Sequence, residues 1–238
     1  MDDTTGNPPP RLAQDLTGIP PGDDLILSVV TGSRAYGLET GDSDTDRRGV
    51  FVAPTADFWR LDKPPTHRDG PLPEQFSWEV ERFCRLALDA NPTVLECLWS
   101  PIVEVATPTG ERLRALRGAF LSRRAGETFG GYADAQFDRL DPAAPKWKQA
   151  MHMIRVLLSA SHLVRHGDLA VGVGPLRDRL LAVRRGEVPW AEVAAWRARL
   201  MAELATARAV LPARAVLPER PDRRAVEEFL LDVRREHL

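Results

Sequence analysis

The feature that most restricts the fold is a hydrophobic strand that runs directly into a Gly-Ser turn. Residues 25–30 read Leu-Ile-Leu-Ser-Val-Val, an aliphatic and β-branched run that predicts a buried strand. Gly32 and Ser33 follow, and a glycine at this point lets the backbone approach a ligand closely. The amides of the following turn, together with the Ser33 hydroxyl, predict a binding site for an anion such as a phosphate group.

Two aspartates precede a second predicted strand, residues 48–53. Ten residues separate Ser33 from the first aspartate, Asp44, and Asp46 lies two positions further on. Carboxylates at positions i and i+2 of a strand project from the same face, where their like charges repel each other. A divalent cation relieves that repulsion. A phosphate site beside such a pair is typical of nucleotidyl transfer, in which Mg²⁺ ions orient a triphosphate and activate an attacking hydroxyl.

The rest of the chain predicts an α+β fold in which a small β-containing module is followed by helices. A third strand is expected at residues 74–78, where polar and aromatic residues alternate, and the four prolines of residues 62–73 indicate a loop. Helices are expected at residues 79–90, from residue 92 onward, and at about 110–118, 121–140, 147–166, 175–185, 189–210 and 222–236. The predicted parts are a flexible N-terminal arm (1–22), a nucleotidyltransferase catalytic module (23–115) and a helical C-terminal domain (116–238).

Polar side chains form one stripe along the predicted helix 147–166. Their spacing of three or four residues places them on one helix face: Lys148, His152, Arg155, Ser159, His162 and His166. The pattern fits a solvent-exposed face as well as a face turned toward the site. In the second case Lys148, His152 and Arg155 would contact the triphosphate or the acceptor backbone. No cysteine or carboxylate accompanies the histidines, so they do not predict a zinc site.

Composition excludes several classes of protein. The 32 basic and 34 acidic residues give a net charge of -2, unlike a histone-like or polyanionic chain. Residues 1–120 carry 12 basic and 19 acidic residues (net -7), whereas residues 121–238 carry 20 and 15 (net +5). This division of charge fits a protein in which a metal site faces a polyanion, although random drift of the composition along the chain would also produce it. The two cysteines exclude a disulfide scaffold, and no apolar run approaches the roughly 18 residues of a membrane span. The acidic, proline-rich N-terminus is unlike a signal peptide, so we expect a cytoplasmic protein.

The Gly-Ser turn followed by Asp-x-Asp resembles the signature of the DNA polymerase beta nucleotidyltransferase superfamily. The longer strings GSRAYGL (residues 32–38) and SDTDRRGV (residues 43–50) resemble its RNA-repair-associated, polymerase-beta-like branch. The likeness continues through Trp78-Glu79, Phe83, the NPTVLE segment at 91–96, the helix that carries Lys148, His152 and Arg155, and the turn at 185–187. It therefore covers most of residues 25–235.

The resemblance implies a third carboxylate on a later strand, beside the aspartates. Glu74 is the first candidate because it opens the third predicted strand, and Glu79 is the alternative. The branch more often has an aspartate at the position of Glu74. The glutamate arm is one methylene longer, so this departure bears on where the metal would sit.

The resemblance also implies roles for the other residues. Asp44, Asp46 and Glu74 would hold two Mg²⁺ (or Mn²⁺) ions, with Glu74 assisting at the ion that activates the acceptor hydroxyl. Gly32 and Ser33 would cradle the β- and γ-phosphates, and Arg34 would either neutralise charge there or pair with an aspartate. Arg48 would brace the carboxylates through a charge-assisted hydrogen bond. Lys148, His152 and Arg155 would complete the nucleotide pocket from the helical side.

These features predict metal-dependent transfer of a nucleoside monophosphate from a nucleoside triphosphate to an acceptor hydroxyl. An RNA 3′ end in RNA repair is the favoured acceptor, because of the resemblance and the basic C-terminal half, and an RNA ligase or another repair protein is a candidate partner. Transfer to a protein or a small molecule is the alternative reaction. A non-catalytic nucleotide- or RNA-binding protein, or a structural partner in a repair assembly, is the alternative class. The intact Gly-Ser and aspartate pair favour catalysis, whereas the glutamate in place of the third aspartate favours a non-catalytic protein.

Overall fold

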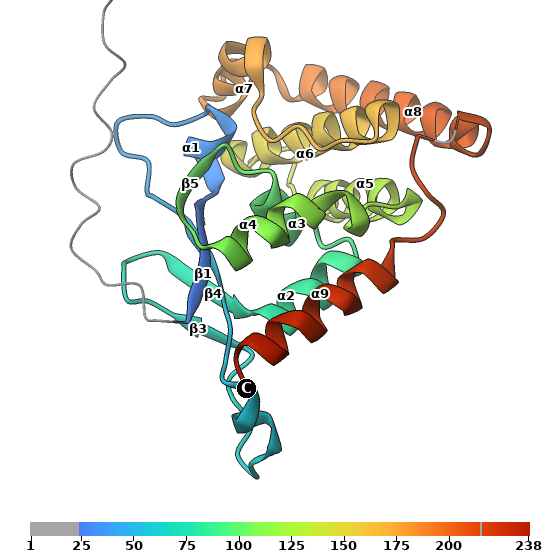
Figure 1. Cartoon of the computed structure of the whole chain (residues 1–238). Helices are drawn as coiled ribbons and strands as arrows, with labels where there is room; N and C mark the ends of the chain where they lie inside the picture. Colours follow the sequence, from blue (N-terminus) through green and yellow to red (C-terminus); the bar gives the residue numbers. More distant parts are fainter. Residues whose placement is uncertain (1–23, 215) are drawn as a thin grey trace, which may run out of the picture.

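The computed structural model describes residues 24–214 and 216–238 and shows a mixed sheet flanked by helices (Figure 1). The arm expected at residues 1–22 lies outside the described residues. Within them, a five-stranded sheet has the order β3-β4-β2-β1-β5. The strands are β1 (Leu25–Val30), β2 (Arg47–Phe51), β3 (His67–Asp69), β4 (Gln75–Glu79) and β5 (Ile102–Ala106). Strands β2 and β4 run parallel, and the other neighbouring pairs run antiparallel.

Strand β1 leads the chain from the core to the candidate site. It is buried almost throughout, because it pairs with β2 on one side and with β5 on the other. The chain leaves β1 at Val30 and enters the short helix α1 (Gly32–Tyr36), which ends at Gly37 in the left-handed conformation. Since Val30 pairs with Arg47, strand β2 starts where β1 ends. The Gly-Ser turn and the aspartates therefore lie at the same end of the sheet.

Helices make up most of the remaining chain. They are α2 (Val80–Leu88), α3 (Pro92–Leu98), α4 (Pro108–Ala115), α5 (Arg123–Phe137), α6 (Trp147–His166), α7 (Arg177–Arg184), α8 (Trp190–Arg214) and α9 (Arg223–Glu236), with short 3₁₀ turns at Thr55–Trp59, Leu116–Phe120 and Gly174–Leu176. Asn91 caps α3 by accepting a hydrogen bond from the Val94 amide (3.2 Å), with Pro92 in the first turn. Among the described helices, none has the length and apolar character needed to cross a bilayer.

The C-terminal helix α9 returns to the sheet-containing part of the molecule. It runs beside α2 and the 3₁₀ turn at Leu116–Phe120 (Figure 1). Arg234 of α9 forms an ion pair with Glu79 at the end of β4 (2.8 Å), and its carbonyl accepts a hydrogen bond from the Thr55 hydroxyl (2.7 Å). Helix α6 packs against three other helices, α5, α7 and α8.

The structure confirms the predicted α+β fold. Strand β1 and helix α6 begin and end at the predicted residues. The prediction of a loop at residues 62–73 is wrong in part, because β3 lies within that segment. Strand β5 lies in a segment for which we predicted no helix or strand. Both are edge strands, each paired with a single neighbour: β3 with β4, which follows it in the chain, and β5 with β1, which lies far away in the sequence. Three residues are too few to show a strand pattern, and local patterns do not record a distant pairing. The boundary between a catalytic module and a helical domain stays a prediction.

Candidate active site

Gly32 is required because the carboxylate of Asp46 occupies the space beside it. The glycine has a φ of +68°, and a Cβ added to it would overlap Asp46 Oδ2 and lie 3.0 Å from Asp46 Cγ. The Asp46 carbonyl accepts hydrogen bonds from the Thr31 amide (2.8 Å) and the Thr31 hydroxyl (3.2 Å). The turn therefore fixes the position of Asp46. This role is additional to the close approach of a ligand that the sequence predicted for Gly32.

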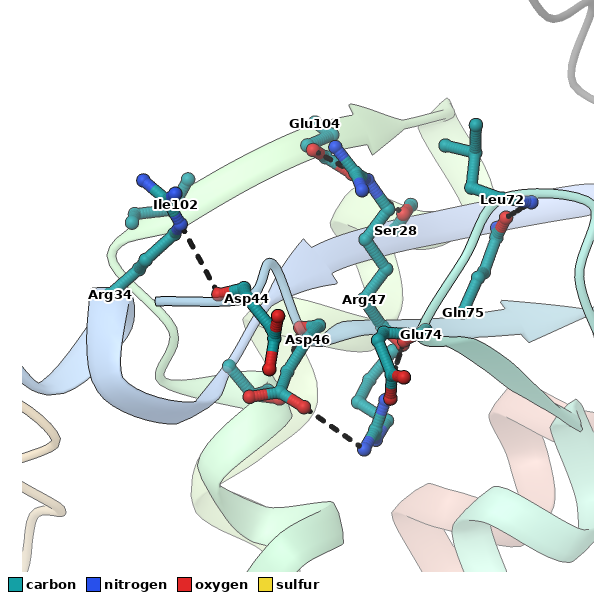
Figure 2. Close-up of polar contacts among 12 residues, drawn as sticks. Ser28, Arg34, Asp44, Asp46, Arg47, Leu72, Glu74, Gln75, Ile102 and Glu104 are labelled. Atoms are coloured by element: carbon teal, nitrogen blue, oxygen red, sulfur yellow. Dashed lines mark hydrogen bonds and ion pairs between the residues drawn. The ribbon is translucent and has the colours of Figure 1, made fainter. Parts of the chain in front are cut away.

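Arg34 holds the loop that carries Asp44. Its guanidinium donates to the backbone carbonyls of Ser43 (2.9 Å) and Asp44 (3.3 Å), the second of which is drawn in Figure 2. These partners are main-chain oxygens rather than an aspartate side chain. Arg34 also lies outside the lining of the cavity described below. Its contacts thus serve to position Asp44.

The two aspartate side chains extend to the same side of the chain, as expected from their spacing (Figure 2). Asp44 is exposed, and Asp46 is half-buried. Arg48 Nη2 lies 3.8 Å from Asp46 Oδ1, which is an ion pair rather than a hydrogen bond. Arg48 therefore braces one of the two carboxylates.

Glu74 lies beside Asp46 at the start of β4, because Arg47 of β2 pairs with the residue that follows Glu74. Its backbone has a φ of +56°, and its carbonyl accepts hydrogen bonds from the Arg47 amide and from Arg48 Nη1, both 3.0 Å. The exposed side chain lines a neighbouring hollow of about 390 Å³, not the main cavity. Glu74 thus reaches the site through its carbonyl, while its carboxylate lies to one side.

Glu79, the alternative third carboxylate, lies at the opposite end of β4. Its side chain is 3% exposed, forms the ion pair with Arg234, and accepts a hydrogen bond from the Glu81 amide at the start of α2 (2.7 Å). Both contacts stabilise the junction between α2 and α9. Of the two candidates, only Glu74 lies at the end of the sheet that carries the aspartates.

A cavity of about 560 Å³ lies where the aspartate end of the sheet meets helices α5 and α6. The side nearest the sheet is formed by Thr31, Gly32, Ser33, Tyr36, Asp42, Ser43, Asp44, Asp46 and Arg48. The side formed by the helices carries Thr93, Glu96, Tyr132, Gln136, Lys148, Gln149, Met151, His152 and Arg184. The cavity thus joins the Gly-Ser turn and both aspartates to later residues that extend from Thr93 to Arg184.

A buried polar network forms the wall beneath part of this cavity. Glu96 accepts a hydrogen bond from the Tyr36 hydroxyl (2.6 Å) and one from Arg155 Nη1 (2.7 Å), and the Arg155 guanidinium lies 3.8 Å from the centre of the Tyr36 ring. Arg155 is 1% exposed, and it keeps its charge because Glu96 raises its pKa against the effect of burial. The structure therefore places Arg155 behind the cavity, paired with Glu96.

His152 lies in the cavity wall as a neutral side chain. Burial lowers its pKa to about 3, and the neighbouring charges of Arg155 and Lys148 act in the same direction. The imidazole lies between two tyrosine rings, with ring-centre distances of 6.3 Å to Tyr36 and 6.0 Å to Tyr132. His152 can therefore exchange hydrogen bonds with a ligand but adds no positive charge at neutral pH.

Two cations in the cavity lining have no ionic partner among the described residues, and they come from different helices. Lys148 is near the start of α6, and Arg184 is the last residue of α7. The Ser33 hydroxyl likewise makes no hydrogen bond within the described part of the chain. By contrast, the other nearby arginines contact carboxylates or carbonyls. Lys148, Arg184 and Ser33 are thus available to an anionic ligand.

The carboxylates fit a metal ion that binds together with its substrate. Across residues 24–214 and 216–238, no three or more His, Cys, Asp and Glu side chains form a group able to hold a metal. Asp44 and Asp46 nevertheless face one cavity. Magnesium in phosphate-transferring sites is usually held by one or two carboxylates, with water and substrate phosphates as the remaining ligands. The pair therefore suits a magnesium–nucleotide complex.

The structure brings six of the nine predicted site residues into one cavity: Gly32, Ser33, Asp44, Asp46, Lys148 and His152. Arg34, Glu74 and Arg155 lie next to it without lining it. Thr93 and Glu96 also line the cavity, and they belong to the segment at 91–96 that carries part of the resemblance, although no role was predicted for them. Lining residues that the sequence analysis did not single out include Tyr132, Gln136, Gln149 and Arg184. Tyr132 and Gln136 are one helical turn apart, so the sequence indicates that they share a face of α5. The sequence of α5 alone does not indicate that this face lines the cavity.

The chain resembles known proteins over most of its length. The sequence model of the RNA repair pathway DNA polymerase beta family (RlaP) matches residues 20–232. The uncharacterized protein YcgL of Bacillus subtilis (strain 168) is 29% identical over 154 residues, which is 62% of this chain. The matched region spans 59% of the length of that relative. No solved structure matches the chain.

Proposed function

The chain belongs to the RNA repair pathway DNA polymerase beta family, and from this premise we propose that it is a metal-dependent nucleotidyltransferase. It would move a nucleoside monophosphate from a nucleoside triphosphate to an acceptor hydroxyl. One observation carries the proposal. The Gly-Ser turn and the aspartate pair line the same cavity as two cations that have no ionic partner among residues 24–214 and 216–238, although the cations come from a distant part of the sequence.

In this proposal Asp44 and Asp46 hold Mg²⁺ or Mn²⁺ in company with the triphosphate. The bound metal supplies charge neutralisation at the phosphates and a lower pKa for the attacking hydroxyl. The chain's own contribution is to keep the carboxylates in position before substrate arrives. Gly32 leaves room for Asp46, Arg34 holds the loop of Asp44, and Arg48 balances part of the negative charge.

The triphosphate meets donors from both sides of the cavity. Ser33 and the amides of its turn bind phosphate oxygens from the side of the sheet. Lys148 and Arg184 neutralise phosphate charge from the helical side, because neither is paired with a carboxylate among the described residues. Arg155 acts behind them by holding Glu96 and Tyr36, and His152 contributes a neutral hydrogen-bonding group.

We propose Glu74 as the third carboxylate, in support of the aspartates. Its position beside Asp46 supports this assignment, whereas Glu79 is already paired with Arg234. Glu74→Gln should lower the rate of transfer by roughly 10–100-fold, the usual cost of losing a supporting residue at a metal site. Glu79→Gln should leave the rate per folded molecule unchanged and lower only the stability.

The acceptor that we propose is an RNA 3′ end, with an RNA ligase or another repair protein as partner. The family supports RNA repair as the setting, and residues 121–238 carry a net charge of +5, which suits a polyanionic acceptor. The direct test is a labelled RNA oligonucleotide incubated with each nucleoside triphosphate and Mg²⁺ or Mn²⁺. The Asp44→Asn/Asp46→Asn variant is the control.

Extension of the RNA by the wild-type protein, and its loss in the double variant, would support the proposal. Extension that persists in the variant would contradict the role of the aspartates. Metal-dependent nucleotide binding without extension would contradict the RNA acceptor and leave a protein or small-molecule acceptor, or a non-catalytic function, to be tested.

A further inference from the structure

The helical side of the cavity carries four uncharged polar side chains on α5 and α6, three of which have no role in the proposed function. Tyr132 and Gln136 lie one turn apart on α5, and Gln149 and His152 lie one turn apart on α6. Helices α5 and α6 pack directly against each other. The rings of Tyr132 and His152 are 6.0 Å apart in a T-shaped arrangement. We call these four residues the neutral wall.

The neutral wall has free hydrogen-bonding capacity. Within the described residues, neither Gln136 nor Gln149 makes a side-chain hydrogen bond, and the Tyr132 hydroxyl has no partner. Tyr132 is 37% exposed and lines the cavity, so part of its side chain can contact a ligand there. An aromatic ring beside two unpaired carboxamides is a surface suited to a flat heterocycle with polar edges.

The charged side chains of the cavity lie outside the neutral wall. The side nearest the sheet carries Asp42, Asp44, Asp46 and Arg48, and the helical side carries Glu96, which is paired with Arg155, together with Lys148 and Arg184. A nucleoside triphosphate has the same asymmetry, with a charged phosphate chain and an uncharged base. Once the aspartates, Lys148 and Arg184 hold the metal and the phosphates, the neutral wall is the part of the lining left for an uncharged base.

We propose that the neutral wall is the base-binding subsite and that it selects adenine; this inference rests on the proposed function. The base stacks on Tyr132, and the larger ring system of a purine gains more contact than a pyrimidine. A glutamine carboxamide offers one donor and one acceptor, which match N7 and the N6 amino group of adenine. The wall contains no carboxylate to accept hydrogen bonds from the neighbouring N1 and N2 donors of guanine.

The test measures equilibrium binding of ATP, GTP, CTP and UTP to the full chain with Mg²⁺, by calorimetry. Inorganic tripolyphosphate is the probe for the phosphate region alone. ATP should bind more tightly than the other three nucleotides. Tyr132→Ala should weaken ATP binding by about tenfold, as expected for loss of one stacked base, and leave tripolyphosphate binding unchanged. Tyr132→Phe, which keeps the ring, should recover most of that affinity.

Two further variants sharpen the test. Gln136→Ala combined with Gln149→Ala should bring ATP binding to the level of GTP. Trp59→Ala is the matched control, because Trp59 is also an exposed aromatic residue (72%) but lies outside the cavity. It should bind all four nucleotides as the wild type does.

The outcomes separate the inference from the proposed function. Equal binding of the four nucleotides, a preference for another base, or loss of tripolyphosphate binding in Tyr132→Ala would overturn the base subsite and leave the transferase proposal in place. Absence of binding for every nucleotide and for tripolyphosphate would overturn both.

Discussion

At the scale of single residues, the contact between Gly32 and Asp46 is the most consequential feature of the site. Gly32→Ala would place a Cβ against the Asp46 carboxylate, at a φ of +68° that disfavours alanine. We expect a loss of about 1–3 kcal/mol of stability and a fall in transfer of about a hundredfold, because the carboxylate must move. Thermal unfolding and single-turnover transfer would measure the two effects.

Gly131→Ala is a matched control for this variant. Gly131 lies within α5, and a Cβ there would meet nothing within 4 Å. Alanine should therefore raise stability by about 0.5–1 kcal/mol, the usual gain in a helix interior. A Gly32→Ala protein that matched it in both stability and transfer would contradict the proposed seating of Asp46.

His152 gives a prediction about pH. Its pKa in the folded protein is lowered to about 3, so it stays neutral while the unfolded chain takes up a proton near its ordinary pKa of 6.5. Stability is therefore lost as the pH falls below about 6.5. Between pH 7 and pH 5 this group alone should cost about 1–2 kcal/mol. Urea unfolding at the two pH values should show a smaller loss in His152→Gln, and equal losses in both proteins would refute the assignment.

The sequence could predict the identities of the site residues better than their contacts. The Gly-Ser and Asp-x-Asp residues all lie within residues 32–46 and carry their own pattern. Arg155, in contrast, is paired with Glu96, 59 positions away, and Arg34 binds main-chain carbonyls. A stripe at helical spacing indicates a shared face, but it does not say which members lie behind the cavity wall.

At the scale of secondary structure, the elements that the sequence predicted well are those with their own hydrophobic pattern. Strand β1 is a continuous aliphatic run, and α6 has long helical periodicity. Strands β3 and β5 have only three and five residues and depend on pairing with β4 and β1. Strand β3 is too short to carry a pattern of its own, and the pairing of β5 with β1 joins distant segments, which single-sequence patterns do not contain.

Helix α9 should contribute stability to the sheet-containing part through Arg234. Its partner Glu79 is almost completely buried, and the Arg234 side chain is 17% exposed. Arg234→Met would leave the Glu79 carboxylate unpaired, so we expect a loss of about 3 kcal/mol in chemical unfolding. Arg235→Met is the control, because its ion pair with Asp232 is exposed and should contribute less than about 0.5 kcal/mol. Similar losses for both variants would contradict this role of α9.

At the scale of the whole molecule, the cavity exists because an N-terminal β-containing unit meets the later helices α5, α6 and α7. The sequence could predict the metal side of this cavity, since its residues are local. It could not predict Tyr132, Gln136 or Arg184, because their faces are chosen by how the helices pack. The uneven charge of the two halves is consistent with the assembled cavity, whose aspartates come from the acidic half.

The uneven charge also gives a test of the acceptor. If RNA binds along the basic half, the logarithm of its binding constant should fall with the logarithm of salt concentration, by about 0.7 per phosphate contacted in a single strand. Fluorescence anisotropy of a labelled RNA between low and physiological salt would measure the slope. A slope near zero would argue against RNA and for a small-molecule acceptor.

The most direct test of the central claim is to follow both products of one turnover. The protein is mixed with α-labelled ATP, RNA and Mg²⁺, and labelled nucleotide in RNA is counted against pyrophosphate released. Nucleotidyl transfer in this cavity predicts one pyrophosphate per nucleotide incorporated, a loss of about a hundredfold or more in Asp46→Asn, and no loss in Trp59→Ala. Equal incorporation by Asp46→Asn, or no pyrophosphate from the wild-type protein with any nucleotide and acceptor, would contradict it.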